Sequence, residues 1–331
     1  MKRLLEVEGL TTNFHIGVGC VQAVRGVSFH LNAGESLGIV GESGSGKSVT
    51  MMSIMGLLPP YAQVSADAIR FDGTDMLHLS AGEFRKLRGN GIGMIFQDPM
   101  TSLNPLYTVE DQITEPLRIH KNMKRREARQ AALELLRRVE IPNPEARLKQ
   151  YPHELSGGMR QRVMIAAAIA CTPKLVIADE PTTALDVTIQ AQVLELLQHL
   201  KSESNSSIIM ITHDLGVIAS MCSRILVMYG GVICEQGTVR EIFYAPKHPY
   251  TWGLLRSIPK MSQERMGKLI PITGTPPDML RPPKGCPFAP RCPHAMPVCR
   301  AYLAPETVLS DTHRCACHLL HPNAPKIERG L

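Results

Sequence analysis

The sequence predicts an α/β fold with a parallel β-sheet core, a helical insertion and a loop-rich C-terminal segment. Three observations lead to this prediction. Short apolar runs that are typical of buried parallel strands alternate with helical segments. A stretch from about residue 103 to residue 170 breaks that alternation and is mainly helical in character. After about residue 244 prolines become frequent, and a chain so rich in proline does not form long helices.

The first part of the core is a strand, a glycine-rich turn and a helix. Ser36–Val40 (SLGIV) is a short apolar run that fits a buried strand and leads directly into Gly41–Ser48. Helix-forming residues then continue over Val49–Leu58 until two prolines stop them. Five further strands are predicted, at Ala68–Phe71, Ile92–Phe96, Leu175–Ala178, Ile208–Ile211 and Ile225–Met228.

Two helices are predicted with particular clarity. Val187–Lys201 places Ile189, Val193, Leu196, Leu197 and Leu200 on one apolar face. Lys124–Val139, within the insertion, is rich in Ala, Leu, Arg and Glu and ends before prolines. We therefore expect an α/β core made of residues 1–102 and 171–244, a helical subdomain of residues 103–170, and a C-terminal domain of residues 245–331.

Composition excludes several classes of protein. The 331 residues are 44% hydrophobic and 20% charged, an ordinary globular balance, and the net charge of +6 is mild. The densest basic run, Lys121–Arg129, has no interleaved aromatics and fits the outer face of a helix better than a nucleic-acid site. No apolar run is long enough to cross a bilayer, and Glu6 and Glu8 interrupt the place of a signal peptide. Most of the nine cysteines are accordingly expected to be thiols.

The segment Gly41–Ser48 (GESGSGKS) fits the P-loop pattern G-x-x-x-x-G-K-[ST]. Its glycines allow successive N–H groups to face one phosphate chain, and the following helix adds its positive N-terminal end. Lys47 is expected to bridge the β- and γ-phosphates, and the Ser48 hydroxyl to bind Mg²⁺. A chance match is rare in a chain of this length. The predicted ATP contacts of this loop are Gly41, Ser43, Gly44, Ser45, Gly46, Lys47 and Ser48.

A pair of acidic residues follows another apolar run. Leu175–Ala178 leads into Asp179 and Glu180, so Asp179 is expected to support the Mg²⁺ directly or through water. Glu180, one residue on, is placed to orient and polarise the attacking water. Two acids after a strand can also cap a helix, but the nearby P-loop favours the catalytic interpretation.

A third motif is specific to one family. Leu155–Gln161 (LSGGMRQ) resembles the LSGGQ signature of ATP-binding-cassette proteins, with Met159 where glutamine is commonest. The resemblance implies that Ser156, Gly157 and Gly158 reach the γ-phosphate held by the P-loop of a second chain. One ATP site would then need two chains.

Other landmarks of that family occur in the expected order. Gln97 resembles the glutamine that touches Mg²⁺ and the attacking water, and Ala184-Leu185-Asp186 resembles the D-loop of the family, which implies that Asp186 contacts ATP. His213 resembles the histidine that contacts the γ-phosphate. Phe14 resembles the aromatic residue that stacks on adenine, although a phenylalanine there could equally be edge packing.

Three segments narrow the resemblance to one group of the family. Phe96–Pro105 (FQDPMTSLNP), His248–Thr251 (HPYT) and the tail after Gly285 resemble the ATPases of oligopeptide and dipeptide importers, a group that also includes nickel importers. The resemblance implies an ATPase at the cytoplasmic face of the inner or plasma membrane that powers peptide uptake. It also implies a second, distinct but paralogous ATPase chain, two transmembrane permease subunits and an extracytoplasmic solute-binding protein. Import of nickel or another small solute is the alternative, and a cassette ATPase acting on nucleic acid is the remote one.

Five of the nine cysteines lie in the last 46 residues. Thiolates in a proline-rich segment with little core suit a metal or cluster that supplies folding energy. Zinc usually prefers ligand pairs two to four residues apart, which these are not, and the absence of any metal stays open as well. The importer resemblance implies a structural [4Fe–4S] cluster held by Cys286, Cys292, Cys299 and Cys317, with Cys315 as the alternative fourth ligand.

Overall fold

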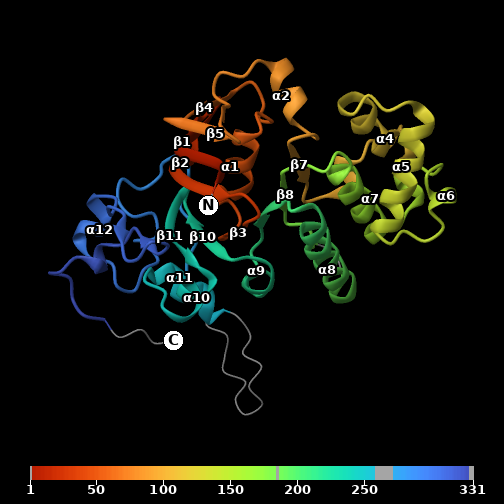
Figure 1. Cartoon of the computed structure of the whole chain (residues 1–331). Coiled ribbons are helices and arrows are strands. Elements are labelled where there is room, and N and C mark those ends of the chain that lie inside the picture. The colour runs from red at the N-terminus through yellow and green to blue at the C-terminus, as the bar shows by residue number, and fades with distance from the viewer. Residues whose placement is uncertain (1, 184–185, 258–270, 328–331) are drawn as a thin grey trace, which may run out of the picture. The chain divides into compact units, whose positions relative to one another are not determined.

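The computed structural model describes residues 2–183, 186–257 and 271–327 (Figure 1). The chain divides into two compact units. The first, called the helical unit, consists of Met1–Arg3, Leu31–Ser36 and His78–Ile211. The second, called the phosphate-loop unit, consists of Leu4–His30, Leu37–Leu77 and Thr212–Leu331.

The phosphate-loop unit contains an antiparallel sheet built on two long strands. Its order is β2-β1-β5-β6, and β4 also pairs with β1. Alternate residues of β1 are buried, and the phase of the alternation changes at Gly9, whose φ of 63° is typical of a bulge. The strands are β1 (Arg3–Ile16), β2 (Gly19–Asn32), β4 (Ala62–Ser65), β5 (Ala68–Phe71) and β6 (Thr74–Asp75).

A second set of strands in the same unit carries the glycine-rich loop. β3 (Ser36–Val40) pairs in parallel with β10 (Arg224–Tyr229), and every residue of both strands is buried. β11 (Val232–Thr238), β13 (Arg314–Cys315) and β12 (Thr307–Val308) continue outward from β10 in antiparallel fashion. The helices of this unit are α1 (Lys47–Ile54), α9 (Leu215–Met221), α10 (Val239–Tyr244), α11 (Pro249–Arg256), α12 (Pro297–Ala301) and the 3-10 turn His318–Leu320.

The helical unit contains three parallel strands in the order β9-β8-β7. β7 (Ile92–Ile95), β8 (Leu175–Asp179) and β9 (Ser207–Ile211) are buried throughout, as expected for parallel strands covered on both faces. Its helices are α2 (Ala81–Leu87), α3 (Pro99–Ser102), α4 (Val109–His120), α5 (Arg125–Arg138), α6 (Pro144–Arg147), α7 (Gly157–Ile169), α8 (Val187–Ser204) and the 3-10 turn Pro152–Glu154.

Helices α4, α5 and α7 pack on one another through apolar faces (Figure 1). Ile113 and Leu117 of α4, Leu136 of α5 and Ile165 of α7 are fully or almost fully buried. Each such side chain contributes about 1.5–3 kcal/mol on burial, so this three-helix packing holds the insertion together without a sheet of its own.

Most predicted elements are present, and one lies in a different context from the one expected. The predicted strand Ala68–Phe71 exists, but it pairs antiparallel with β1 instead of joining a parallel sheet. It also pairs antiparallel with β6, through a tight hairpin turn at Asp72 and Gly73, whose φ values are 48° and 83°. A parallel partner would need a much longer crossover.

The helix expected over Val49–Leu58 begins earlier and ends earlier, at Lys47 and Ile54. Gly56, with a φ of 60°, ends it before the two prolines. Within the described ranges, no helix combines the length and the apolar character that crossing a membrane requires.

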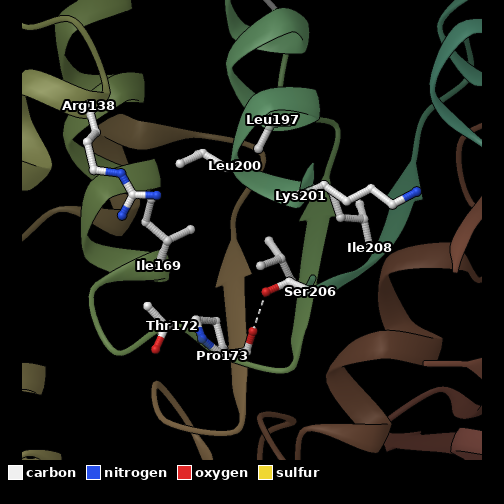
Figure 2. Close-up of a pocket in the computed structure, with 10 residues that line it drawn as sticks. Arg138, Ile169, Thr172, Pro173, Leu197, Leu200, Lys201, Ser206 and Ile208 are labelled. Atoms are coloured by element: carbon white, nitrogen blue, oxygen red, sulfur yellow. Dashed lines mark hydrogen bonds between the residues drawn. The ribbon is translucent and has the colours of Figure 1, made fainter. Parts of the chain in front are cut away.

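A small apolar pocket lies in the helical unit (Figure 2). Ile169, Leu197, Leu200 and Ile208 line it, and the Ser206 hydroxyl beside it donates to the carbonyl of Pro173 at 2.6 Å. Its volume of about 20 Å³ is close to that of a single water probe. It is therefore a packing gap and not a substrate site.

Candidate functional site

The loop Gly41–Ser48 joins β3 to α1, so its strand–loop–helix context is the one that the sequence predicted. Gly41, Gly44 and Gly46 have φ values of 156°, 75° and 99°. A Cβ on Gly41 would collide with the main-chain oxygen of Met228, and one on Gly46 would lie 2.6 Å from the oxygen of Ala23. Both positions therefore require glycine, because the backbone turns where neighbouring chain leaves no room.

Lys47 is the first residue of α1, and its side chain turns back into the loop. Its Nζ donates to the carbonyl oxygens of Gly41 at 2.7 Å and Glu42 at 3.0 Å, and only 5% of the residue is exposed. Ser43 and Gly44 are exposed and Ser48 is half-buried. The ammonium is thus held at the concave side of a loop whose exposed tip is open to an anionic ligand.

In the helical unit, hydrogen bonds join the side chains of Gln97, Glu180 and Thr183 near the carboxyl ends of β7 and β8. Asp179 is the last residue of β8 and is 3% exposed. Glu180 follows it, and its Oε2 accepts from Gln97 Nε2 and from Thr183 Oγ1, each at 2.9 Å. The register that places Ile95 opposite Ala178 explains why Gln97 and Glu180 come together. Sequence reasoning missed Thr183, for which the sequence carries no distinctive signal.

Glu180 has an unusual backbone. Its φ is 47°, in the left-handed region that non-glycine residues rarely occupy, and its N–H donates to the oxygen of Ile211 at 2.8 Å. A residue held in this way costs about 1–3 kcal/mol and persists where its surroundings determine it, often at functional sites. The amide of Gln97 is exposed and the carboxylate of Glu180 is held in place, so the two groups together can orient a water molecule on their solvent-facing side.

The predicted Mg²⁺ ligands are distributed over both units. Ser48 belongs to the phosphate-loop unit, and Gln97 and Asp179 to the helical unit. All three offer oxygen, the donor that Mg²⁺ prefers, so the residue types fit this ion. His213 follows β9, belongs to the phosphate-loop unit and is exposed.

Ser156 caps the helix α7, with its hydroxyl accepting from the N–H of Met159 at 3.3 Å. Ser156 and Gly157 are exposed, and a Cβ on Gly157 would meet nothing within 4 Å. The open N-terminus of this 13-residue helix presents N–H groups and a partial positive charge to solvent. Gly158 lies closer to the protein, because a Cβ there would sit 3.2 Å from the side chain of Ile189.

Two further predicted ATP contacts lie apart from these motifs in the sequence. Asp186 caps α8 by accepting from the N–H of Ile189 at 3.0 Å, whereas Ala184 and Leu185 lie outside the described residues. Phe14 of β1 is half-buried, and its ring centroid is 6.1 Å from that of the exposed Tyr61. This contact is consistent with edge packing and leaves adenine stacking a prediction.

The tail cysteines are close enough to influence one another electrostatically. The pKa of Cys317 is raised to about 12, mainly by burial and to a smaller extent by the thiols of Cys286, Cys292 and Cys299. Burial raises the pKa of Cys315 as well, and the carboxylate of Glu235 and the thiols of Cys317, Cys234 and Cys286 add to the effect. These effects do not distinguish Cys317 from Cys315 as a fourth ligand, so that choice stays a prediction. Among the described residues, no group of three or more His, Cys, Asp or Glu side chains is placed to hold a metal ion.

A cavity of about 290 Å³ lies beside Cys286 in the phosphate-loop unit. Arg25, Cys234, His248 and Glu306 also line it. Arg25 donates through Nη2 to the carbonyl of Pro283, while its buried Nη1 has no hydrogen-bond partner within the described part of the chain. The cavity thus combines space, a thiol and a partly satisfied cation.

Comparisons with known proteins agree with this geometry. The family model described as ABC transporter matches residues 24–183, and the model described as Oligopeptide/dipeptide transporter, C-terminal region, matches residues 234–299. The oligopeptide transport ATP-binding protein OppD of Bacillus subtilis (strain 168) is 56% identical, over 98% of this chain and 91% of that protein. The dipeptide transport ATP-binding protein DppD of the same organism is 54% identical, over 96% of this chain and 95% of that protein.

A solved structure shows the same fold. The dimeric post-hydrolysis state of the ATP-binding cassette MJ0796 bound to ADP and Pi is 30% identical, with a TM-score of 0.65. The match covers 72% of this chain and 99% of that chain.

Proposed function

This chain belongs to the ABC transporter family, and we propose that it is the ATP-hydrolysing subunit of an importer of dipeptides and oligopeptides. The observation that supports the peptide assignment is the similarity to oligopeptide and dipeptide relatives along nearly the whole chain, including its C-terminal region. The phosphate loop and the Gln97–Glu180 pair supply the chemistry that such a subunit needs.

In the proposed mechanism Lys47 exchanges the two carbonyls that it now contacts for the β- and γ-phosphates of ATP. Glu180, oriented by Gln97 and Thr183, accepts a proton from the attacking water and places the oxygen in line with the γ-phosphate. Ser48, Asp179 and Gln97 would hold Mg²⁺, which would supply positive charge to offset that of the phosphates. His213 donates to the γ-phosphate, and Phe14 stacks on the adenine.

We propose that the site is completed by a second cassette chain. The open N-terminus of α7, with Ser156, Gly157 and Gly158, would bind the γ-phosphate on the partner's loop, and Asp186 would lie beside that nucleotide. Closure of the two chains on ATP and reopening after hydrolysis would drive transport. We propose that the second chain is a distinct paralogue, as the resemblance to the peptide importers implies.

The proposed membrane partners are two permease subunits, served by an extracytoplasmic solute-binding protein. In the segment that follows Gln97, Met100, Leu106 and Tyr107 are 61%, 81% and 55% exposed. Apolar side chains exposed together in this way suit a contact with another protein. We propose that they dock on the permeases, with the chain bound peripherally at the cytoplasmic face of the membrane.

We propose that the chain has three domains. The core consists of residues 1–102 and 171–244, the signature domain of residues 103–170, and the C-terminal domain of residues 245–331.

We also propose a structural [4Fe–4S] cluster on Cys286, Cys292, Cys299 and Cys317. The effect of the other three thiols on the pKa of Cys317 supports it. Of the four cysteines, Cys286 lines the cavity that also contains the partly satisfied guanidinium of Arg25. A cluster with four thiolates is anionic, so the guanidinium would offset its charge. Iron and acid-labile sulfide assays on anaerobically purified protein test the proposal, and bound zinc without sulfide would overturn it.

The function as a whole is tested in the assembled complex. With the chain, a second cassette, two permeases and a peptide-binding protein in proteoliposomes, a labelled dipeptide and a labelled pentapeptide should accumulate only with ATP. Lys47→Ala should abolish accumulation, because the loop then lacks its ammonium. ATP-driven uptake of Ni²⁺ but of neither peptide would replace the peptide assignment with the nickel one.

A further inference from the structure

Glu42, the second residue of the phosphate loop, poses an electrostatic problem. Its carboxylate belongs to a loop that is proposed to bind a highly charged anion, and like charges at short range oppose binding. Only 25% of the side chain is exposed, so water screens the charge incompletely. Some other group has to offset it.

Arg291, from the C-terminal segment 249 residues away in sequence, supplies that group. Its Nη1 and Nη2 donate to the two carboxylate oxygens of Glu42 at 2.6 and 3.1 Å, a bidentate ion pair. The guanidinium is 6% exposed, and its remaining N–H groups donate to the hydroxyl of Tyr229 and to the carbonyls of Ile272 and Thr273. All five of its donors are therefore used, which fixes its orientation.

The main chain of Glu42 is held as well. Its N–H donates to the hydroxyl of Tyr250 at 2.8 Å, and its carbonyl accepts from Lys47 Nζ at 3.0 Å. Tyr250 is fully buried in α11, and its ring packs at 4.5 Å from that of Tyr229 and at 5.3 Å from that of Phe288, measured between centroids. The aromatic cluster of Tyr229, Tyr250 and Phe288 thus contacts Glu42 through the Tyr250 hydroxyl, and Glu42 in turn contacts Lys47.

We propose that Arg291 and Tyr250 are positioning residues for the nucleotide: Arg291 neutralises Glu42, Tyr250 fixes its main chain, and together they preorganise the phosphate loop for a triphosphate. The C-terminal segment then contributes to ATP affinity without touching ATP. This inference rests on the proposed function, because it assumes that the loop binds ATP.

The test is equilibrium ATP binding by the full-length chain, measured as the Kd of ATP with Mg²⁺ at low salt. Arg291→Gln should raise the Kd at least tenfold, since it leaves the Glu42 carboxylate unpaired beside the phosphates. Adding Glu42→Gln to Arg291→Gln should lower the Kd at least threefold again, although it restores none of the contacts that Arg291 made. The defect of Arg291→Gln should also shrink in 0.5 M KCl, because salt screens the repulsion.

Arg300→Gln is the matched control, because it removes the same charge from an exposed position of the same segment, and its Kd should equal that of the wild type. A Kd for Arg291→Gln within threefold of the wild type would overturn the proposal. The proposal would also be overturned if the double variant had the same Kd for ATP as Arg291→Gln, because the defect would then come from lost packing and not from lost charge.

Tyr250→Phe supplies an independent arm if Arg291→Gln does not fold. It keeps the aromatic packing and removes the acceptor of the Glu42 N–H, so we expect a Kd at least threefold higher with unfolding temperature little changed. An unchanged Kd would then overturn the proposal. Failure of the wild type to bind ATP is a different result, because it refutes the proposed function itself.

Discussion

At the scale of single residues, Glu180 is the most constrained member of the site. A buried strand delivers it, a left-handed backbone turns it, and Gln97 and Thr183 bind one of its carboxylate oxygens. Such a backbone costs free energy that tighter packing elsewhere must offset. The arrangement therefore fixes the direction of a single carboxylate, which a general base requires.

Glu180→Gln tests this role. Glutamine keeps the shape and an oxygen that accepts from Gln97, so the Kd of ATP should stay within about threefold, while a general base is worth about 10²–10⁴ in rate. We expect phosphate release in the assembled complex to fall at least a hundredfold. Thr183→Ala, which removes one hydrogen bond but leaves the carboxylate, should cost less than about tenfold. Equal turnover by wild type and Glu180→Gln would remove Glu180 from the mechanism.

At the scale of elements, α7 has a cap that serves two purposes in the proposed mechanism. Ser156 satisfies a helix N–H inside its own chain and is proposed to bind phosphate on another. Aspartate is an equally good cap but carries a negative charge. Ser156→Asp should therefore keep the free energy of unfolding within about 0.5 kcal/mol, while ATP hydrolysis in the assembled complex falls at least a hundredfold.

The N-cap of α2 provides the opposite case, a cap that is expected to affect stability but not turnover. Ser80 caps α2 in a capping box with Glu83, and neither residue is among the proposed contacts with ATP. Ser80→Ala should lower the free energy of unfolding by about 1 kcal/mol and leave turnover of the folded protein unchanged. Urea unfolding and phosphate release, measured on both variants, separate the two roles. If both variants lose stability and turnover together, the phosphate role of Ser156 has no support.

Elements with a strong local signal could be predicted from the sequence, and long-range contacts could not. β3 and β8 are buried apolar runs, and the glycines of Gly41–Ser48 mark the turn between β3 and α1. The antiparallel pairing of β5 with β1 is such a long-range contact, whereas its pairing with β6 follows from the local Asp72-Gly73 turn. The contact of Arg291 with Glu42 joins residues far apart in sequence, and nothing local to either residue indicates it.

At the scale of the whole molecule, a buried polar cluster joins β11, α11 and the tail. Glu235 is fully buried and accepts from the N–H groups of Lys247 and His248, from the Thr251 hydroxyl and from His313 Nε2, at 2.6–2.9 Å. His248 Nδ1 in turn accepts from the N–H of Tyr250 at 3.1 Å, which requires that nitrogen to be unprotonated. Burial lowers the pKa of His248 to about 4, although the carboxylate of Glu235 raises it.

This burial makes stability depend on pH. The unfolded chain takes up the His248 proton near pH 6.5, the folded chain only near pH 4, so stability falls as the pH falls through this interval. His248→Asn keeps a cap acceptor for the Tyr250 N–H but does not titrate. Between pH 7.5 and 5 the wild type should lose about 2 kcal/mol more than His248→Asn in urea unfolding. His78 is exposed, so the control variant His78→Asn should keep the pH dependence of the wild type. If His248→Asn also kept it, the prediction would be contradicted.

The proposed composite site also makes a prediction about assembly. If the serine–glycine turn of this chain closes on ATP held by a partner, association of the two cassettes must depend both on this turn and on the ATP bound to the partner's phosphate loop. Glu180→Gln, which binds ATP without splitting it, should form a stable complex with the partner cassette in ATP and Mg²⁺, seen by light scattering after gel filtration. Ser156→Asp with Glu180→Gln should bind ATP on its own loop with the same Kd, since that turn belongs to the other site. It should nevertheless form at least tenfold less complex, because its carboxylate repels the partner's γ-phosphate. Equal association by the two variants would mean that each chain holds its nucleotide without help from the other.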